Sequence, residues 1–218
     1  KYKGKRLGAI GDLATLSFYA NKIITCGEGG AVLTNSKELA KRCYILRDHG
    51  MSRSSDPLKR YVHLDLGFNY RMTNMQAAIG LAQLERLDQT ISPKRKIGEK
   101  YNELLKGCST LQLPLPETSY ARNVYWVYPV VLNDSCHITA TGAKASFEDR
   151  KIGTRPFFYP MHKQKIFKKM KLFSKKEKFI NADYLSKNGF YLPSGIGILN
   201  QQIDFVGKTL LKIIENKN

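Results

Sequence analysis

The stretch that decides the fold is Gly11-Asp-Leu-Ala-Thr-Leu-Ser17-Phe-Tyr-Ala-Asn-Lys22-Ile-Ile-Thr-Cys-Gly27-Glu28-Gly29-Gly30. Residues 14–18 have the pattern of a short strand, and glycines open a second strand over residues 29–34. The turn between them carries the Lys22 amine, five residues after the Ser17 hydroxyl. Glycines let the backbone approach a ligand closely, and a hydroxyl at a strand end can hold a phosphate. Spacing alone indicates only a surface lysine, and the glycine-rich turn could serve any tight loop.

Three helices are predicted in the first half of the chain. Ser36 is a good N-cap for the first, and Thr73 with Gln76 forms the Thr-x-x-Gln pattern of a capping box that opens the second. Residues 51–72 between them have the composition of a loop. Ser92-Pro93 starts or kinks the third helix, because proline is tolerated in a first turn. The second helix is predicted to carry one apolar face: Ala77, Leu81, Leu84 and Leu87.

The second half of the chain predicts a smaller mixed domain, with a boundary near residues 90–108. Gly107 is a candidate C-cap for the third helix. The strongest strand pattern of the chain spans residues 124–132. A helix across residues 140–150, a strand near 154–158 and a helix over 177–187 follow. A last helix from about Asn200 is predicted to turn one face inward: Ile203, Val206, Leu210, Ile213 and Ile214.

Composition limits the classes of protein to be considered. No stretch of the 218 residues approaches the roughly 18 uninterrupted apolar residues of a membrane helix. The four cysteines match no zinc pattern and indicate free thiols in a reducing cytoplasm. The net charge of +18 includes one dense basic run, Lys163–Lys178, which could be a solvated face, a contact for an anionic substrate or a nucleic-acid surface. No helix-turn-helix, zinc-finger or RNP signature accompanies it, so no nucleic-acid partner is expected.

The stretch around Lys22 closely resembles the Ser-Phe-x-x-x-Lys-x-x-x-x-Gly-Glu-Gly-Gly segment of the DegT/DnrJ/EryC1/StrS family of nucleotide-sugar aminotransferases. Further segments resemble motifs of the same family in the same order. They are Leu46-Arg-Asp-His-Gly50, Leu66-Gly-Phe-Asn-Tyr-Arg-Met-Thr73 with Gln76-Ala-Ala-Ile-Gly-Leu-Ala-Gln-Leu84, Ile152-Gly-Thr-Arg-Pro-Phe-Phe-Tyr-Pro-Met-His162, and Gly189-Phe-Tyr-Leu-Pro-Ser194. The version ending at His162 is especially similar to perosamine synthases, which transfer an amino group to a GDP-4-keto-6-deoxy hexose.

The resemblance implies an α/β fold, the C-terminal part of a fold type I transferase that depends on pyridoxal phosphate. Residues 1–92 would be the remnant of the large cofactor-binding domain, and residues 93–218 the small C-terminal α+β domain. The implied reaction transfers an amino group from glutamate to a 4-keto-6-deoxy nucleotide sugar, in the cytoplasm, for cell-surface polysaccharide such as lipopolysaccharide O-antigen. The alternatives are a sugar dehydratase of the same family and a truncated, non-catalytic paralogue. Dehydratase variants replace the Schiff-base lysine by histidine, and Lys22 argues for transfer.

The family motifs also imply the cofactor contacts. Lys22 matches the Schiff-base lysine that holds pyridoxal phosphate, and it would then serve as general base and acid. Ser17 matches a serine that binds the cofactor phosphate. Asn69 matches an asparagine that reaches the phosphate from the neighbouring subunit, which implies a homodimer, or else it stabilises its own loop. Arg71 is the second choice for that contact.

Five more residues are candidates on the substrate side, each with a structural alternative. Glu28 contacts the sugar or orders the turn beyond Lys22. His49 is a substrate contact or a polar residue of the turn before Gly50. Arg155, Tyr159 and His162 lie in the segment that resembles the nucleotide-sugar motif, where an arginine can bind a diphosphate through two hydrogen bonds, or else they are structural. No metal site is expected.

We expect these 218 residues alone to be inactive as a transaminase. In the family, the aspartate that pairs with the pyridine nitrogen of the cofactor, a group that stacks on its ring and a phosphate-holding loop lie upstream of the first residue of this chain. Without that aspartate the cofactor is a poor electron sink. A turnover assay of the chain with a 4-keto nucleotide sugar and glutamate measures this, and clear activity would refute the expectation. The full-length parent should be active.

Overall fold

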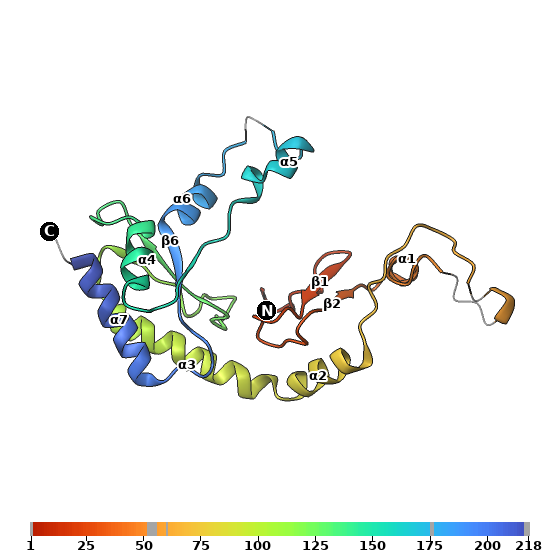
Figure 1. Ribbon diagram of the computed structural model, residues 1–218, viewed down its shortest axis with the longest axis horizontal. Helices are drawn as coiled ribbons and strands as arrows, with labels where there is room; N and C mark the ends of the chain where they lie inside the picture. The colour runs from red at the N-terminus through yellow and green to blue at the C-terminus, as the bar shows by residue number, and fades with distance from the viewer. Residues whose placement is uncertain (1, 52–55, 60, 175–176, 216–218) are drawn as a thin grey trace. The chain divides into compact units, whose positions relative to one another are not determined.

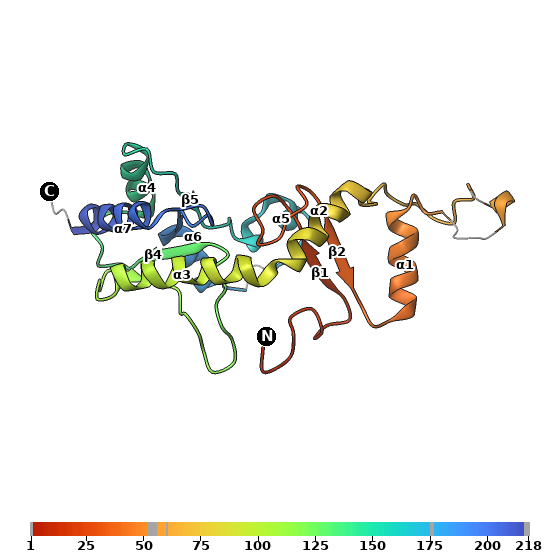
Figure 2. The same ribbon diagram turned by 90° about the horizontal axis from the view of Figure 1, so that it is seen from below.

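The structure is a computed structural model, drawn from two directions in Figures 1 and 2. Short strands and helices follow one another along the whole chain, so the α/β class predicted from the sequence is confirmed. The chain divides into two compact units between residues 90 and 91, and residues 118–122 belong with the first unit. The residues that the structure describes are 2–51, 56–59, 61–174 and 177–215.

The first unit contains a two-stranded antiparallel ribbon, β1 (Ala14–Ser17) and β2 (Gly30–Leu33), drawn in red and orange in Figure 1. Both strands lie within the ranges predicted from the sequence. Ser17 pairs with Gly30 in the register of the ribbon, so the loop between the strands starts and ends at neighbouring positions. The unit also contains α1 (Lys37–Arg47), the 3-10 turn η1 (Pro57–Lys59) and α2 (Asn74–Glu85).

Both predicted N-caps of the first unit are present. Ser36 Oγ accepts a hydrogen bond from Leu39 N–H at 3.2 Å. Thr73 Oγ1 accepts from Gln76 N–H at 3.2 Å, and Gln76 Oε1 accepts from Thr73 N–H at 3.0 Å, which completes the reciprocal capping box. These caps satisfy amide groups that the first turn of a helix leaves without an intrahelical partner.

The apolar face predicted for α2 is not buried. Leu81 and Leu84 are 57% and 53% exposed, and neither α1 nor α2 has a buried residue. Among the described residues of the first unit, Cys26 is the one buried apolar side chain. The spacing along α2 is that of an amphipathic helix, but burial also needs a second surface, which this unit does not place over that face. The first unit therefore has no apolar core of its own within the described residues.

The second unit is built on a four-stranded antiparallel sheet with the strand order β3-β4-β6-β5. Its strands are β3 (Leu111–Gln112), β4 (Tyr128–Leu132), β5 (Arg155–Pro156) and β6 (Gly189–Leu192). Its helices are α3 (Leu87–Leu105), which starts in the last residues of the first unit, η2 (Met161–Lys163), α4 (Ala140–Glu148), α5 (Lys165–Lys169), α6 (Ile180–Asn188) and α7 (Asn200–Glu215). In the part of the chain that is described, no helix combines the length and apolar character needed to cross a membrane.

The apolar core lies in the second unit and combines residues of the sheet with residues of α3, α4 and α7. Helices α4 and α7 pack side by side, and α4 also contacts β6 (Figures 1 and 2). The inward face predicted for the last helix is confirmed, since all five of its predicted residues are at most 6% exposed. The largest fully buried side chains are Tyr101, Tyr128, Phe147, Phe190, Leu105, Ile203, Leu210 and Val130.

The strand predicted over residues 124–132 starts late, at Tyr128. Tyr125 has a φ of +48°, in the left-handed region, which interrupts the extended backbone. Its ring lies against Gly98 of α3, where a Cβ atom would be 2.3 Å from the ring carbon Cγ. Asn102 joins the two tyrosines, because its Nδ2 donates to Tyr125 Oη at 3.1 Å and its Oδ1 accepts from Tyr128 Oη at 2.6 Å. Burial raises the pKa of both hydroxyls.

The third predicted helix also differs at its start. Helix α3 begins at Leu87, so Pro93 lies inside it rather than in its first turn. Proline at this position removes one backbone hydrogen bond from the helix. Gly107 follows the helix with a φ of +86°, as a C-terminal capping glycine should.

Gly98→Ala should lower the free energy of unfolding of the second unit by about 1–2 kcal/mol, because overpacking outweighs the gain in helix propensity. The added methyl group would meet the ring of Tyr125, which is 2% exposed and held at its hydroxyl by Asn102. Urea unfolding followed by the fluorescence of Trp126, the single tryptophan, measures the change.

Gly153→Ala is the matched control, because no atom lies within 4 Å of the position its Cβ would take. Its effect should stay within about 0.5 kcal/mol. Equal losses in the two variants would contradict the packing of Tyr125 on Gly98.

Candidate active site

Lys22 lies in the loop between β1 and β2, residues 18–29, which we call the lysine loop. The loop closes on the backbone of Phe18. The Phe18 N–H donates to Gly29 O at 2.9 Å, and Phe18 O accepts from Cys26 N–H at 3.1 Å and from Thr25 Oγ1 at 2.9 Å. The first residue of the loop therefore anchors the end of the loop through both its N–H and its carbonyl group.

Ser17 and Lys22 are linked through the backbone of Tyr19. Ser17 Oγ, at the end of β1, accepts from Tyr19 N–H at 3.4 Å, and Lys22 N–H donates to Tyr19 O at 2.9 Å. The Lys22 side chain is half-buried, whereas Ser17 is exposed. The structure thus places Ser17 and Lys22 at the start of the same loop, each hydrogen-bonded to the backbone of Tyr19.

Gly29 allows the close packing at the far end of the lysine loop. Its φ is +152°, and a Cβ atom there would lie 2.7 Å from Cys26 Sγ and 2.8 Å from Met72 Cε. Any larger residue would displace both neighbours. Met72 also brings the segment of Asn69 and Arg71 into contact with the loop.

Helix α2 holds the lysine loop through two glutamine side chains that the sequence motifs did not place in the site. Gln83 Oε1 accepts from Thr25 N–H at 2.9 Å, and Gln76 Nε2 donates to Glu28 O at 3.3 Å. The two residues are seven positions apart and so share a face of the helix. That spacing, next to the family motif, is the signal from which they could have been found.

A second group of candidate residues gathers at the C-terminal end of α1. Asn69 forms an isolated antiparallel bridge with Asp48, and Arg71 Nε lies 3.2 Å from Asp48 Oδ1. His49 has a φ of +56°, and its N–H donates to Phe68 O at 3.0 Å. The side chain of Asn69 is exposed and that of Arg71 is 54% exposed. The structure therefore brings these three candidates together on one surface of the first unit.

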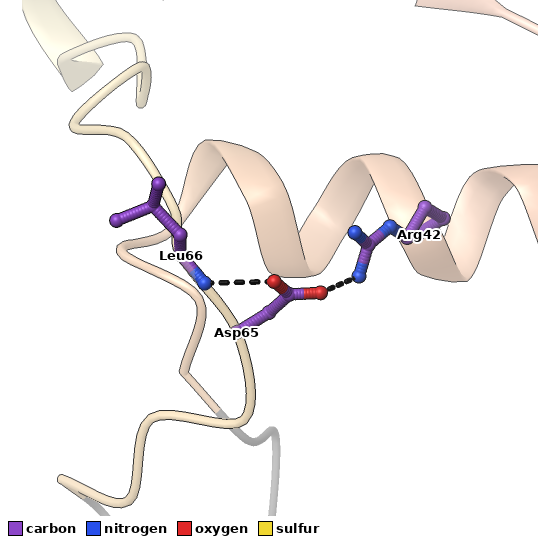
Figure 3. A network of polar contacts seen from close by, with 3 residues as sticks. All are labelled: Arg42, Asp65 and Leu66. Atoms are coloured by element: carbon purple, nitrogen blue, oxygen red, sulfur yellow. Dashed lines mark hydrogen bonds and ion pairs between the residues drawn. The ribbon is translucent and has the colours of Figure 1, made fainter.

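An ion pair between Arg42 and Asp65 ties this segment to α1 (Figure 3). Asp65 Oδ1 also accepts from Leu66 N–H at 2.8 Å. The Arg42 guanidinium, with the Leu66 amide, lowers the pKa of the Asp65 carboxyl. Within the loop predicted over residues 51–72, the described residues otherwise contain only η1 and isolated bridges, and residues 52–55 and 60 lie outside the described part.

The remaining candidates lie in the second unit. Arg155 opens β5, pairs with Tyr191 of β6 and is exposed, and Tyr159 is 59% exposed. His162 differs, because its Nε2 lies 2.9 Å from Asp183 Oδ1 and its ring stacks on Phe179 at 4.6 Å. These contacts tie η2 to the segment around α6, so His162 helps to hold the segment that presents Arg155 and Tyr159.

The basic run predicted over Lys163–Lys178 begins in the same cluster. Lys163 Nζ lies 2.8 Å from Asp183 Oδ1, and Lys163, together with His162, lowers the pKa of the Asp183 carboxyl. The run continues through α5, while residues 175–176 lie outside the described part.

The polar groups of the first unit suit an aldehyde that also carries a phosphate. Lys22 supplies an amine, which can hold an aldehyde covalently. Ser17, Asn69 and Arg71 supply hydroxyl, amide and guanidinium donors of the kinds that bind phosphate. This donor set fits pyridoxal phosphate.

Comparison with known proteins supports the motif resemblance. Residues 1–211 match the model of the DegT/DnrJ/EryC1/StrS aminotransferase family. The GDP-perosamine synthase of Vibrio cholerae is 37% identical over 203 residues, which cover 92% of this chain and 52% of that protein. The GDP-perosamine synthase of Escherichia coli O157:H7 is 36% identical over 218 residues, which cover 100% of this chain and 56% of that protein. The chain thus spans about half the length of the curated relatives it matches.

The fold is likewise shared. The Helicobacter pylori aminotransferase PseC, which takes part in the biosynthesis of pseudoaminic acid, superimposes with a TM-score of 0.86 at 22% identity. The overlap covers 99% of this chain and 56% of PseC. The sugar-aminotransferase fold predicted from the motifs is therefore confirmed. The match to the family model runs through both units, so the chain belongs to the DegT/DnrJ/EryC1/StrS aminotransferase family.

Proposed function

We propose that this chain is part of an aminotransferase that moves an amino group from glutamate to a 4-keto-6-deoxy nucleotide sugar, with pyridoxal phosphate as cofactor. The observation that carries the proposal is the lysine loop, which holds a half-buried Lys22 and follows directly on Ser17, with both residues hydrogen-bonded to the backbone of Tyr19. The likeness to two GDP-perosamine synthases favours a GDP-linked sugar and a role in cell-surface polysaccharide synthesis.

Lys22 has the central chemical role in this proposal. Its Nζ atom would hold the cofactor aldehyde and, once released by the incoming amine, would carry the proton between the substrate carbon and the cofactor. Pyridoxal phosphate, when bound, supplies the electron sink for this proton transfer. Ser17 would hold the phosphate at the end of β1.

Asn69 is the better of the two candidates for the phosphate contact across a homodimer. The guanidinium of Arg71 is already paired with Asp48, whereas the Asn69 side chain is exposed. We propose that Asn69 serves the cofactor of the neighbouring subunit, while Arg71 and Asp48 fix the backbone that presents it. Each working site would then need two copies of the chain.

Arg155 and Tyr159 are the proposed contacts for the nucleotide diphosphate and sugar. Both are exposed, and an arginine can bind a diphosphate through two parallel hydrogen bonds. His162 would influence substrate binding indirectly, because its contacts with Asp183 and Phe179 position the segment that carries Arg155 and Tyr159. On the first unit, Glu28 and His49 are proposed to face the sugar, since the Glu28 side chain is exposed although its carbonyl group is bonded.

The two units fit the division that the family resemblance implies. We propose that residues 1–92 belong to a larger cofactor-binding domain and that residues 93–218 form the small C-terminal domain. The first unit, which lacks an apolar core within its described residues, supports this assignment. The four free cysteines suit a reducing compartment, consistent with a cytoplasmic enzyme.

Incubation with pyridoxal phosphate followed by borohydride should label Lys22 in preference to the other lysines, because in the proposed site Lys22 holds the aldehyde while Ser17 holds the phosphate. Peptide mass mapping measures the label on each lysine. Lys22→Arg should remove the preferred label, and Lys100→Arg, a change on α3, should leave it in place. Uniform labelling of surface lysines would argue for a non-catalytic chain.

A mixed dimer tests the contribution of Asn69 in the active enzyme that contains this chain. Asn69→Ala and Lys22→Ala chains, each with little activity alone, should together give one working site per heterodimer, about half of the wild-type value, by symmetry. Turnover of the purified heterodimer measures this. If the mixture stays inactive, the contact does not cross between subunits.

A further inference from the structure

We infer that Gln83 and Gln76 of α2 are positioning residues for Lys22, holding the lysine loop from outside. The inference rests on the proposed function for the task of Lys22. Its physical basis, however, is a set of hydrogen bonds within the first unit that stands whether or not the chain is catalytic.

Thr25 is the point at which the lysine loop is held most tightly. Its Oγ1 donates to Phe18 O at 2.9 Å and accepts from Gly27 N–H at 2.9 Å. Its own N–H donates to Gln83 Oε1 at 2.9 Å, in a half-buried setting. The first two bonds lie inside the loop, so the bond to Gln83 is the one that fixes Thr25 to a helix.

Lys22 lies on the chain segment between Phe18 and Thr25. Phe18 follows β1 directly and is fixed by the ribbon, and Thr25 is fixed by Gln83. A segment fixed at both ends has far fewer conformations than one fixed at a single end. The bond from Gln83 therefore limits where the Lys22 amine can go, and this effect passes through the backbone of Thr25.

Gln76 makes the second attachment and uses both ends of its amide group. Its Oε1 accepts from Thr73 N–H in the capping box, and its Nε2 donates to Glu28 O at 3.3 Å. The partners determine the orientation of this amide, because the Thr73 N–H can only donate and the Glu28 carbonyl can only accept. Glu28 O also accepts from Cys26 Sγ at 3.1 Å, so this contact fixes the far end of the loop.

Gln83 must accept a hydrogen bond from the loop and Gln76 must donate one to it, so the same substitution should affect the two positions differently. Gln83 acts as an acceptor, so Gln83→Glu keeps its function and Gln83→Met, of similar length, removes it. Gln76 acts as a donor to Glu28, so Gln76→Glu keeps the cap but loses the loop contact. The same substitution should therefore be tolerated at one position and disruptive at the other, on the same helix and with the same change of charge.

The experiment measures borohydride-trapped pyridoxal phosphate on Lys22, relative to the other lysines, as a function of pH. Gln83→Met and Gln76→Glu should each lower the plateau of this preference about fivefold, the change expected when one hydrogen bond worth about 1 kcal/mol is lost. Gln83→Glu should keep the plateau, although the midpoint of the profile can shift with the added charge. Gln89→Glu, an exposed position on α3, is the control for charge alone.

Hydrogen exchange at the Thr25 amide gives a readout that needs no cofactor. Protection should be lost in Gln83→Met and kept in Gln83→Glu, with unchanged unfolding of the second unit showing that the rest of the chain is intact. Unchanged preference and protection in Gln83→Met, or equal losses in Gln83→Met and Gln83→Glu, would overturn the inference alone. A wild-type chain without preference for Lys22 would overturn the proposed function and, with it, the role of the glutamines.

Discussion

The candidate site depends on the backbone of one residue, Phe18. The antiparallel register of β1 and β2 brings Ser17 opposite Gly30, and Phe18 then receives the returning chain on both its N–H and its carbonyl group. Without this closure the Lys22 amine would lie on an open connection between two short strands. The pairing of two short strands thus gives a closed loop that carries Lys22 and begins next to Ser17 in the sequence.

Each of the two units is stabilised internally by a different kind of interaction. The second unit has an apolar core from the sheet, α3, α4 and α7, whereas the described part of the first buries one apolar side chain, Cys26. The geometry around Lys22 therefore relies on directional hydrogen bonds, each with a net value of about 1 kcal/mol. Such bonds fix the positions of atoms well but contribute little to the free energy of folding. The exposed apolar face of α2 would need a further surface to become buried.

Features encoded by neighbouring residues were predictable. The strands at the lysine loop, the caps at Ser36 and Thr73 and the buried face of α7 all follow from local patterns. Contacts between distant residues were not, and Gln83 and Thr25 are 58 positions apart. The left-handed Tyr125 and the ion pair of Arg71 with Asp48 are of the same kind, since each depends on which segments pack together. Lys22 and Ser17 were identified from the family motif, because their spacing alone did not distinguish them from surface residues.

Gln76 illustrates how such an arrangement restricts evolutionary change. Its carbonyl oxygen completes a helix cap and its nitrogen bonds the backbone of the lysine loop. Among the common side chains, asparagine has the same two groups but is one carbon shorter, and glutamate has the length but not the donor. Glutamate would keep the helix cap and lose the loop contact, whereas a side chain with neither group would lose both. Selection on the reaction would thus also preserve the start of the helix, and drift at this position would be slow even though the side chain is only half-buried.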